Sequence, residues 1–126
     1  MLTILDVPHD NVLAVRIDGK IENDDMERMV EEMNRKFALL EDAGNPTKLR
    51  AYVEAVDFRG ISVEALMTEL KGVFPHINDF EKKAVVSDMD WVETVTKIFS
   101  PLTDWWIEGR HYRPENKDEA LAWAAE

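Results

Sequence analysis

Residues 48–56 read Lys-Leu-Arg-Ala-Tyr-Val-Glu-Ala-Val, and this stretch decides the expected fold. One face of the predicted strand carries an apolar residue at every second position: Leu49, Ala51, Val53 and Ala55. The opposite face adds Tyr52 and Val56, so both faces of the strand are suited to burial. A strand of this kind is typical of the centre of a parallel sheet that helices cover on both sides.

The segments on either side alternate between strand and helix patterns, which predicts the order ββαβαβαβα. The predicted strands cover residues 2–6, 12–18, 48–56, 82–87 and about 106–113. The predicted helices begin near Asp24, at Ser62, at Trp91 and at Asn116. We therefore expect an α/β domain with a five-stranded, mostly parallel sheet, an antiparallel N-terminal hairpin and four helices. Residues 1–126 are expected to form this single domain.

Local signals predict where several of these elements begin and end. Gly19 is expected to end the second strand, and residues 58–61 are expected to connect the central strand to the next helix. Asp24 with Glu27, and Asn116 with Glu119, have the spacing of capping boxes at helix starts.

The composition excludes several classes of protein. The net charge of −11 argues against nucleic-acid binding, which requires a basic surface. The absence of cysteine excludes disulfides and thiolate chemistry. The first residues lack the pattern of a signal peptide, and no apolar stretch is long enough to span a membrane, so we expect a cytoplasmic protein without a targeting segment. Any contact with the inner membrane would be peripheral and hydrophobic, because the charge opposes electrostatic docking.

No catalytic or phosphate-binding motif is recognised, so we expect a noncatalytic protein without a cofactor or metal. Asp88 and Asp90 follow a predicted parallel strand and have two interpretations. They can cap the next helix, or their carboxylates can hold a divalent cation.

All four tryptophans lie at or after residue 91, and Trp105 and Trp106 are adjacent. Adjacent side chains diverge in both helices and strands, so one of this pair is expected to lie outside the main core. Such a tryptophan can line a pocket for an apolar ligand, lie at a membrane interface or anchor a homodimer. The alternative is irregular core packing beneath a loop.

Four segments in this order resemble the SpoIIAA-like family, within the STAS superfamily. They are Gly19-Lys20-Ile21, the strand from Leu49 to Glu54, the stretch from Phe80 to Asp88 followed by Trp91, and the final Glu119-Ala120-Leu121-Ala122-Trp123. In the anti-sigma factor antagonists of this superfamily, a serine that opens the helix after the central strand is phosphorylated by a partner kinase. The matching position here is Ser62, although the Asp-Ser-Ser-Gly signature is absent.

The SpoIIAA-like group also resembles CRAL-TRIO lipid-binding domains in fold, which implies a hydrophobic pocket between sheet and helices. We expect an apolar or lipid-like ligand there. One wall would comprise Phe58, Leu66, Leu70 and Phe74, and the other Trp91, Val95, Phe99, Trp105 and Trp106. The alternative function is that of a STAS-type regulator acting through protein partners, with Ser62 as phosphate acceptor. Ser62 also has a purely local interpretation as a helix cap.

Overall fold

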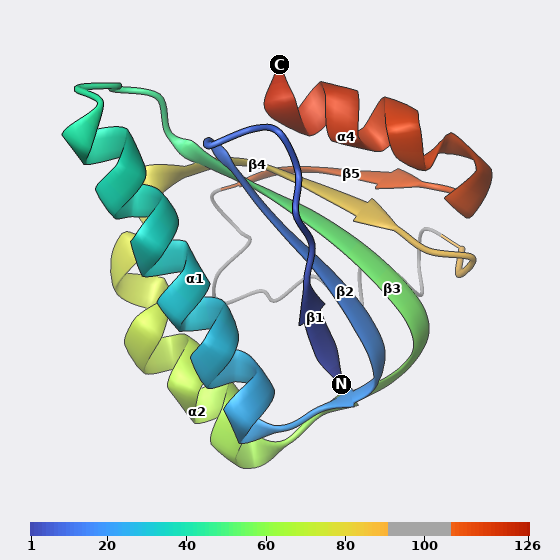
Figure 1. Ribbon diagram of the computed structural model, residues 1–126. Helices are drawn as coiled ribbons and strands as arrows, with labels where there is room; N and C mark the ends of the chain where they lie inside the picture. The colour runs from blue at the N-terminus through green and yellow to red at the C-terminus, as the bar shows by residue number, and fades with distance from the viewer. Residues whose placement is uncertain (91–106) are drawn as a thin grey trace.

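The computed structural model describes residues 1–90 and 107–126. Five strands form one sheet in the order β1-β2-β3-β4-β5, in which β1 is antiparallel to β2 and the other pairs are parallel (Figure 1). The strands are β1 (Leu2–Ile4), β2 (Val12–Ile21), β3 (Leu49–Ile61), β4 (Phe80–Val86) and β5 (Glu108–Tyr112). The helices are α1 (Asn23–Asp42), α2 (Val63–Gly72) and α4 (Lys117–Ala125), with short 3₁₀ segments at Phe74–Asp79 and Pro114–Asn116. The predicted fold class is confirmed, while the helix expected from Trp91 lies outside the described residues.

The strand predicted to be central, β3, occupies the middle of the sheet. It pairs with β2 through Leu13↔Ala51 and with β4 through Ala51↔Lys83. Tyr52 and Val53 point to opposite faces and are both nearly inaccessible to solvent. Burial on both faces explains why apolar residues occupy both sets of alternating positions.

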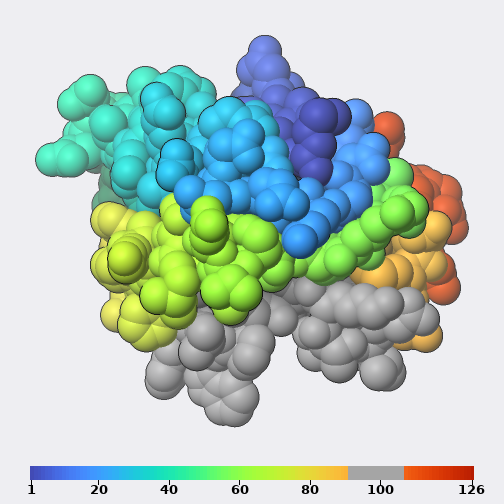
Figure 2. All heavy atoms as spheres, turned by 90° about the horizontal axis from the view of Figure 1, so that it is seen from below, coloured from blue at the N-terminus to red at the C-terminus, as the bar shows by residue number. Residues whose placement is uncertain are grey.

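Helices cover both faces of the sheet, which gives three layers (Figure 1). α1 and α2 lie side by side over one face, and Figure 2 shows their residues adjacent on the molecular surface. A Cβ atom added to Gly72 of α2 would lie 2.9 Å from a methyl group of Val30 on α1, so the two helices approach closely there. α4 covers the opposite face, where Trp123 packs with Tyr52, Ala84 and Val86.

Two strands extend further than the sequence predicts. β2 continues beyond Gly19 to Ile21, because Gly19 adopts a positive φ of 73° within a register shift between Asp18 and Lys20. Glycine adopts this conformation readily, so it forms a bulge here and does not end the strand. β3 also continues through residues 58–61, which were expected to form a connection. This extension carries positive φ values at Asp57 and Gly60.

The helix caps also differ in part from the predictions. At the start of α1, the Asp25 carboxylate accepts a hydrogen bond from Glu22 N at 2.9 Å, so Glu22 and Asp25 take the place of the predicted pair Asp24 and Glu27. Asn116 makes no side-chain capping bond at the start of α4, so that predicted capping box is wrong. A 3₁₀ turn beginning at Pro114 leads into α4 instead.

Cationic side chains from the sheet meet the C-terminal end of α4. Lys82 Nζ donates to the carbonyl of Trp123 at 3.2 Å, and Arg50 donates to the carbonyl of Ala125 at 3.4 Å. Arg50 is buried and also pairs with Glu81 at 2.7 Å. Cations are favourable at this end of a helix because the last carbonyls lack partners within the helix and carry partial negative charge.

Asp25 joins α1 to the edge strand β1. Its Oδ1 accepts a hydrogen bond from Leu2 N at 3.1 Å and from Arg28 Nη2 at 2.6 Å. Burial raises the pKa of Asp25, but the hydrogen bonds from Glu22, Leu2 and Arg28 outweigh it, and the net effect is a pKa below the usual value. The ionised carboxylate therefore stabilises the folded state at neutral pH.

We expect Asp25→Asn to lower the free energy of unfolding at pH 7 by about 1–3 kcal/mol, because it weakens charge-assisted hydrogen bonds at a buried position. A lowered pKa contributes stability above the unfolded-state pKa, and this contribution is lost as the pH falls through the folded-state value. The difference between variant and wild type should therefore shrink on acidification. Urea unfolding from pH 7 to pH 3 measures it.

The matched control is Asp24→Asn, which removes the same charge from the same helical turn at an exposed position. Its effect should stay within about 0.5 kcal/mol. Equal losses for the two variants would show that only the charge near the helix N-terminus matters and would contradict the role given to Asp25.

Candidate functional site

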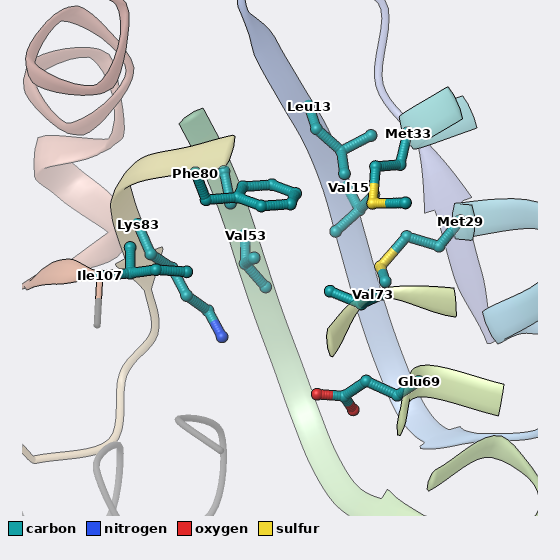
Figure 3. A pocket seen from close by; sticks show the side chains of 11 residues that line it. Leu13, Val15, Met29, Met33, Val53, Glu69, Val73, Phe80, Lys83 and Ile107 are labelled. Carbon is teal, nitrogen blue, oxygen red and sulfur yellow. The ribbon is translucent and has the colours of Figure 1, made fainter. Parts of the chain in front are cut away.

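A cavity of about 80 Å³ lies between the sheet and the two helices α1 and α2 (Figure 3). β2, β3 and β4 form its floor, and side chains from α1 and α2 form its opposite wall. Most of its lining is apolar. The described lining residues are Leu13, Val15, Met29, Met33, Ala51, Val53, Glu69, Val73, Phe80, Lys83 and Ile107.

The volume limits what this cavity can hold. An engineered apolar cavity of about 150 Å³ accommodates benzene, with six carbon atoms. By the same measure, 80 Å³ has room for about three or four carbon atoms. Pockets for drug-sized ligands are several times larger, so a long acyl chain would require the helices to move.

The sequence predicted a pocket in this layer but a different lining. Phe58 packs against the core cluster beneath α1 and α2, Leu66 and Leu70 are partly buried, and Phe74 lies in the 3₁₀ segment with 44% of its surface exposed. None of these four is among the described lining residues. The other predicted wall, Trp91, Val95, Phe99, Trp105 and Trp106, lies outside the described residues.

The difference arises from the orientation of α2. Ala65, Glu69 and Val73 follow one another at four-residue spacing; Ala65 and Val73 are buried, while Glu69 and Val73 line the cavity. The face that hydropathy favours contains Val63 and Met67, which are 78% and 46% exposed. A prediction from hydropathy alone therefore turns the wrong face of α2 toward the sheet.

Among the described lining residues, two are charged, and neither was predicted. Lys83 comes from β4 and Glu69 from α2, on opposite walls (Figure 3). Both side chains extend toward the same end of the cavity, beside Val53. The sequence contained a signal for Lys83, since alternation places it on the same strand face as the fully buried Val85. For Glu69, the signal was its four-residue spacing from both Ala65 and Val73.

Ser62 lies at the N-terminus of α2, as predicted. Its Oγ accepts a hydrogen bond from Ala65 N at 3.1 Å, which confirms the helix-cap interpretation. The adjacent Val63 is exposed, so the start of α2 is open to contact by another molecule.

A second polar contact lies at the carboxyl end of β4. Ser87 is buried, and its Oγ lies 3.1 Å from Nε2 of His111 on β5. Arg113 donates to the carbonyl of Asp88 at 2.6 Å. Over residues 1–90 and 107–126, no group of three or more histidine or acidic side chains is arranged to hold a metal ion. Within the same residues, no helix has the length and apolarity that crossing a membrane requires.

Comparison with known proteins supports the fold assignment. The structure is similar to the crystal structure of an uncharacterised protein of the DUF3478 family, with a SpoIIAA-like fold, from Shewanella loihica PV-4. The TM-score is 0.63 and the sequence identity 25%, over 98% of this chain and 92% of that one. The comparison with curated proteins gave no match. The SpoIIAA-like family model matches residues 12–125, which include every described strand and helix except β1, and the chain therefore belongs to the SpoIIAA-like family.

Proposed function

We propose that this protein is a noncatalytic binding module whose cavity takes the apolar part of a small ligand. The observation that carries the proposal is the cavity beneath α1 and α2, because the described residues that line it are apolar apart from Glu69 and Lys83. Burial of apolar surface contributes about 0.8 kcal/mol per methylene, so a group of three or four carbons provides useful affinity.

The packing of α2 bears on how large the ligand can be. Ala65 is the buried residue within α2, and Val73 follows at its C-cap. A helix with few buried contacts separates from its neighbours at a low cost in free energy. A lipid-like ligand would enter by displacing α2, whereas a smaller ligand fits the cavity as it stands. Peripheral membrane contact and homodimer formation remain predictions from the sequence.

A homologous series of primary alcohols tests the proposal and measures the cavity. Affinity should rise about fourfold for each added methylene until the cavity is full, at about three or four carbons. A plateau beyond that length indicates a rigid cavity, whereas a continued rise indicates that α2 moves. NMR titration of the methyl signals of Leu13, Val53 and Val73 follows binding at the site.

Ala51→Leu should abolish these methyl shifts, because the larger side chain fills the cavity from its floor. Val56→Leu is the matched control, since Val56 lies on the opposite face of β3 and is 47% exposed. Thermal unfolding checks that both variants fold. If no alcohol shifts the cavity methyls, or if Ala51→Leu binds as the wild type does, the proposal is wrong.

The second candidate function is regulation through a protein partner, as the STAS superfamily implies. The observation that favours it is Ser62 at the start of α2, beside exposed apolar side chains at Val63 and Met67. A phosphate on Ser62 would lie at a helix N-terminus, where backbone N–H groups and the helix dipole favour negative charge.

Phosphosite mapping of the protein isolated from its own cells tests this candidate, which predicts phosphate on Ser62. Unmodified Ser62 under all growth conditions would exclude regulation by phosphorylation of this residue.

The role of Ser62 as a helix cap is tested separately. Ser62→Ala should lower the free energy of unfolding by about 1 kcal/mol, and Ser62→Asp, which retains an acceptor oxygen, should recover most of that loss.

A further inference from the structure

The exposed side of α2 leads to an inference about a partner, which is independent of the cavity and its ligand. We propose that α2 is the contact surface of a homodimer, in which α2 of one protomer packs antiparallel against α2 of a second copy of the chain. Apolar side chains would form the centre of this contact, and two reciprocal ion pairs would lie beside them.

The first observation is an apolar patch that α2 turns away from the sheet. The patch comprises Val63, Met67 and Phe74, all of which are exposed to solvent. Val63 and Met67 are four residues apart and therefore lie on one face of α2, and Phe74 follows seven residues after Met67. None of the three is among the described residues that line the cavity. Exposed groups of large apolar side chains mark surfaces that contact another molecule.

The second observation is a pair of opposite charges beside this patch. Glu64 and Lys71 are both exposed and lie seven residues apart, on the same side of α2. A rise of about 1.5 Å per residue separates them by about 10 Å along the helix, which is too far for an ion pair within one chain. Over residues 1–90 and 107–126, neither forms an ion pair with another residue.

A two-fold axis joins these two observations. When two copies of a helix pack antiparallel about such an axis, residues equally far from it on either side lie opposite each other. An axis beside Met67 is about midway between Glu64 and Lys71, so Glu64 of each copy would lie opposite Lys71 of the other. Met67 would meet Met67 of the second copy, and Phe74 would lie near the second copy's Val63.

The distribution of charge also favours this surface. Two chains that each carry a net charge of −11 repel one another, and acidic residues outnumber basic ones on α1. The exposed side of α2 instead carries one charge of each sign, Glu64 and Lys71. Two copies can therefore approach each other at α2 without bringing like charges together.

The length of α2 limits the strength of the contact. With 10 residues, α2 buries less surface than the total of about 1,600 Å² that is typical of a stable complex, so we expect monomer and dimer in equilibrium. Sedimentation velocity over about a hundredfold range of concentration should show a dimer fraction that rises with concentration.

Charge reversal tests whether the two copies meet as proposed. Glu64→Lys and Lys71→Glu each place like charges opposite each other and should weaken dimer formation about tenfold or more. Mixing the two variants should restore association, because every charge on one chain then meets an opposite charge on the other. Glu31→Lys and Lys48→Glu are the matched controls at exposed positions outside α2, and each should leave the dimer fraction close to that of the wild type.

Met67→Glu tests the centre of the patch. It should make the protein monomeric at every concentration, because it places two carboxylates together at the two-fold axis. Alcohol binding at the cavity methyls should not change, since Met67 is exposed and is not among the described lining residues. Thermal unfolding checks that each variant folds.

Three results would each overturn the proposal: a wild type that is monomeric throughout, a dimer that survives Met67→Glu, or a mixture of the two charge-reversal variants that stays monomeric. Flotation with phosphatidylcholine vesicles identifies a different occupant. If the wild type is monomeric and floats with the vesicles while Met67→Glu does not, the patch faces a membrane and the homodimer is wrong. None of these results bears on the cavity, which the alcohol series tests separately.

Discussion

The structure depends on the burial of β3 on both faces. A central parallel strand cannot leave either face to solvent when Tyr52 lies on one side and Val53 on the other. Cover on one side comes from α1 and α2, and cover on the other from α4. Connections between parallel strands must return to the same end of the sheet, so those from β2 to β3 and from β3 to β4 pass over one face and supply α1 and α2. α4 follows the last strand and covers the other face. The three layers follow from this one requirement.

The two sides of the sheet meet the requirement differently. On the α4 side, polar groups are paired closely: Arg50 with Glu81, Lys82 with the carbonyl of Trp123, and the Tyr52 hydroxyl with Glu54. Burial, reinforced by the bond to Glu54, raises the pKa of Tyr52 far above its usual value and keeps the hydroxyl a neutral donor. On the α1 and α2 side, the packing leaves a space beside Ala51 and Val53. The cavity on which the proposed function rests therefore lies in the α1 and α2 layer.

Much of the fold could be predicted because its signals are local. The alternation around Tyr52 and Val53 identified the central strand, and the Ser62 cap identified the start of α2. Gly19 could not be interpreted correctly, because a glycine at the end of a strand and one in a bulge look alike until the pairing strand is known. The capping box of α1 uses Asp25, and the carboxylate of Asp25 also accepts a hydrogen bond from Leu2 N, a donor 23 residues earlier in the chain. Local spacing could not reveal this partner. The cavity lining was missed for a similar reason, since the charges of Glu69 and Lys83 made their inward positions look like solvent-exposed ones.

The anchoring of α4 has a consequence for the order of folding. With nine residues, this helix is too short to be stable alone in water. The cations that meet its C-terminal carbonyls belong to β3 and β4, more than 30 residues earlier in the chain. They lie side by side only after the parallel strands have paired, which is the slow, non-local step in a sheet of this kind. Docking of α4 therefore follows sheet formation, and until then the Tyr52 face of the sheet is exposed as the apolar surface on which a partly folded chain would aggregate.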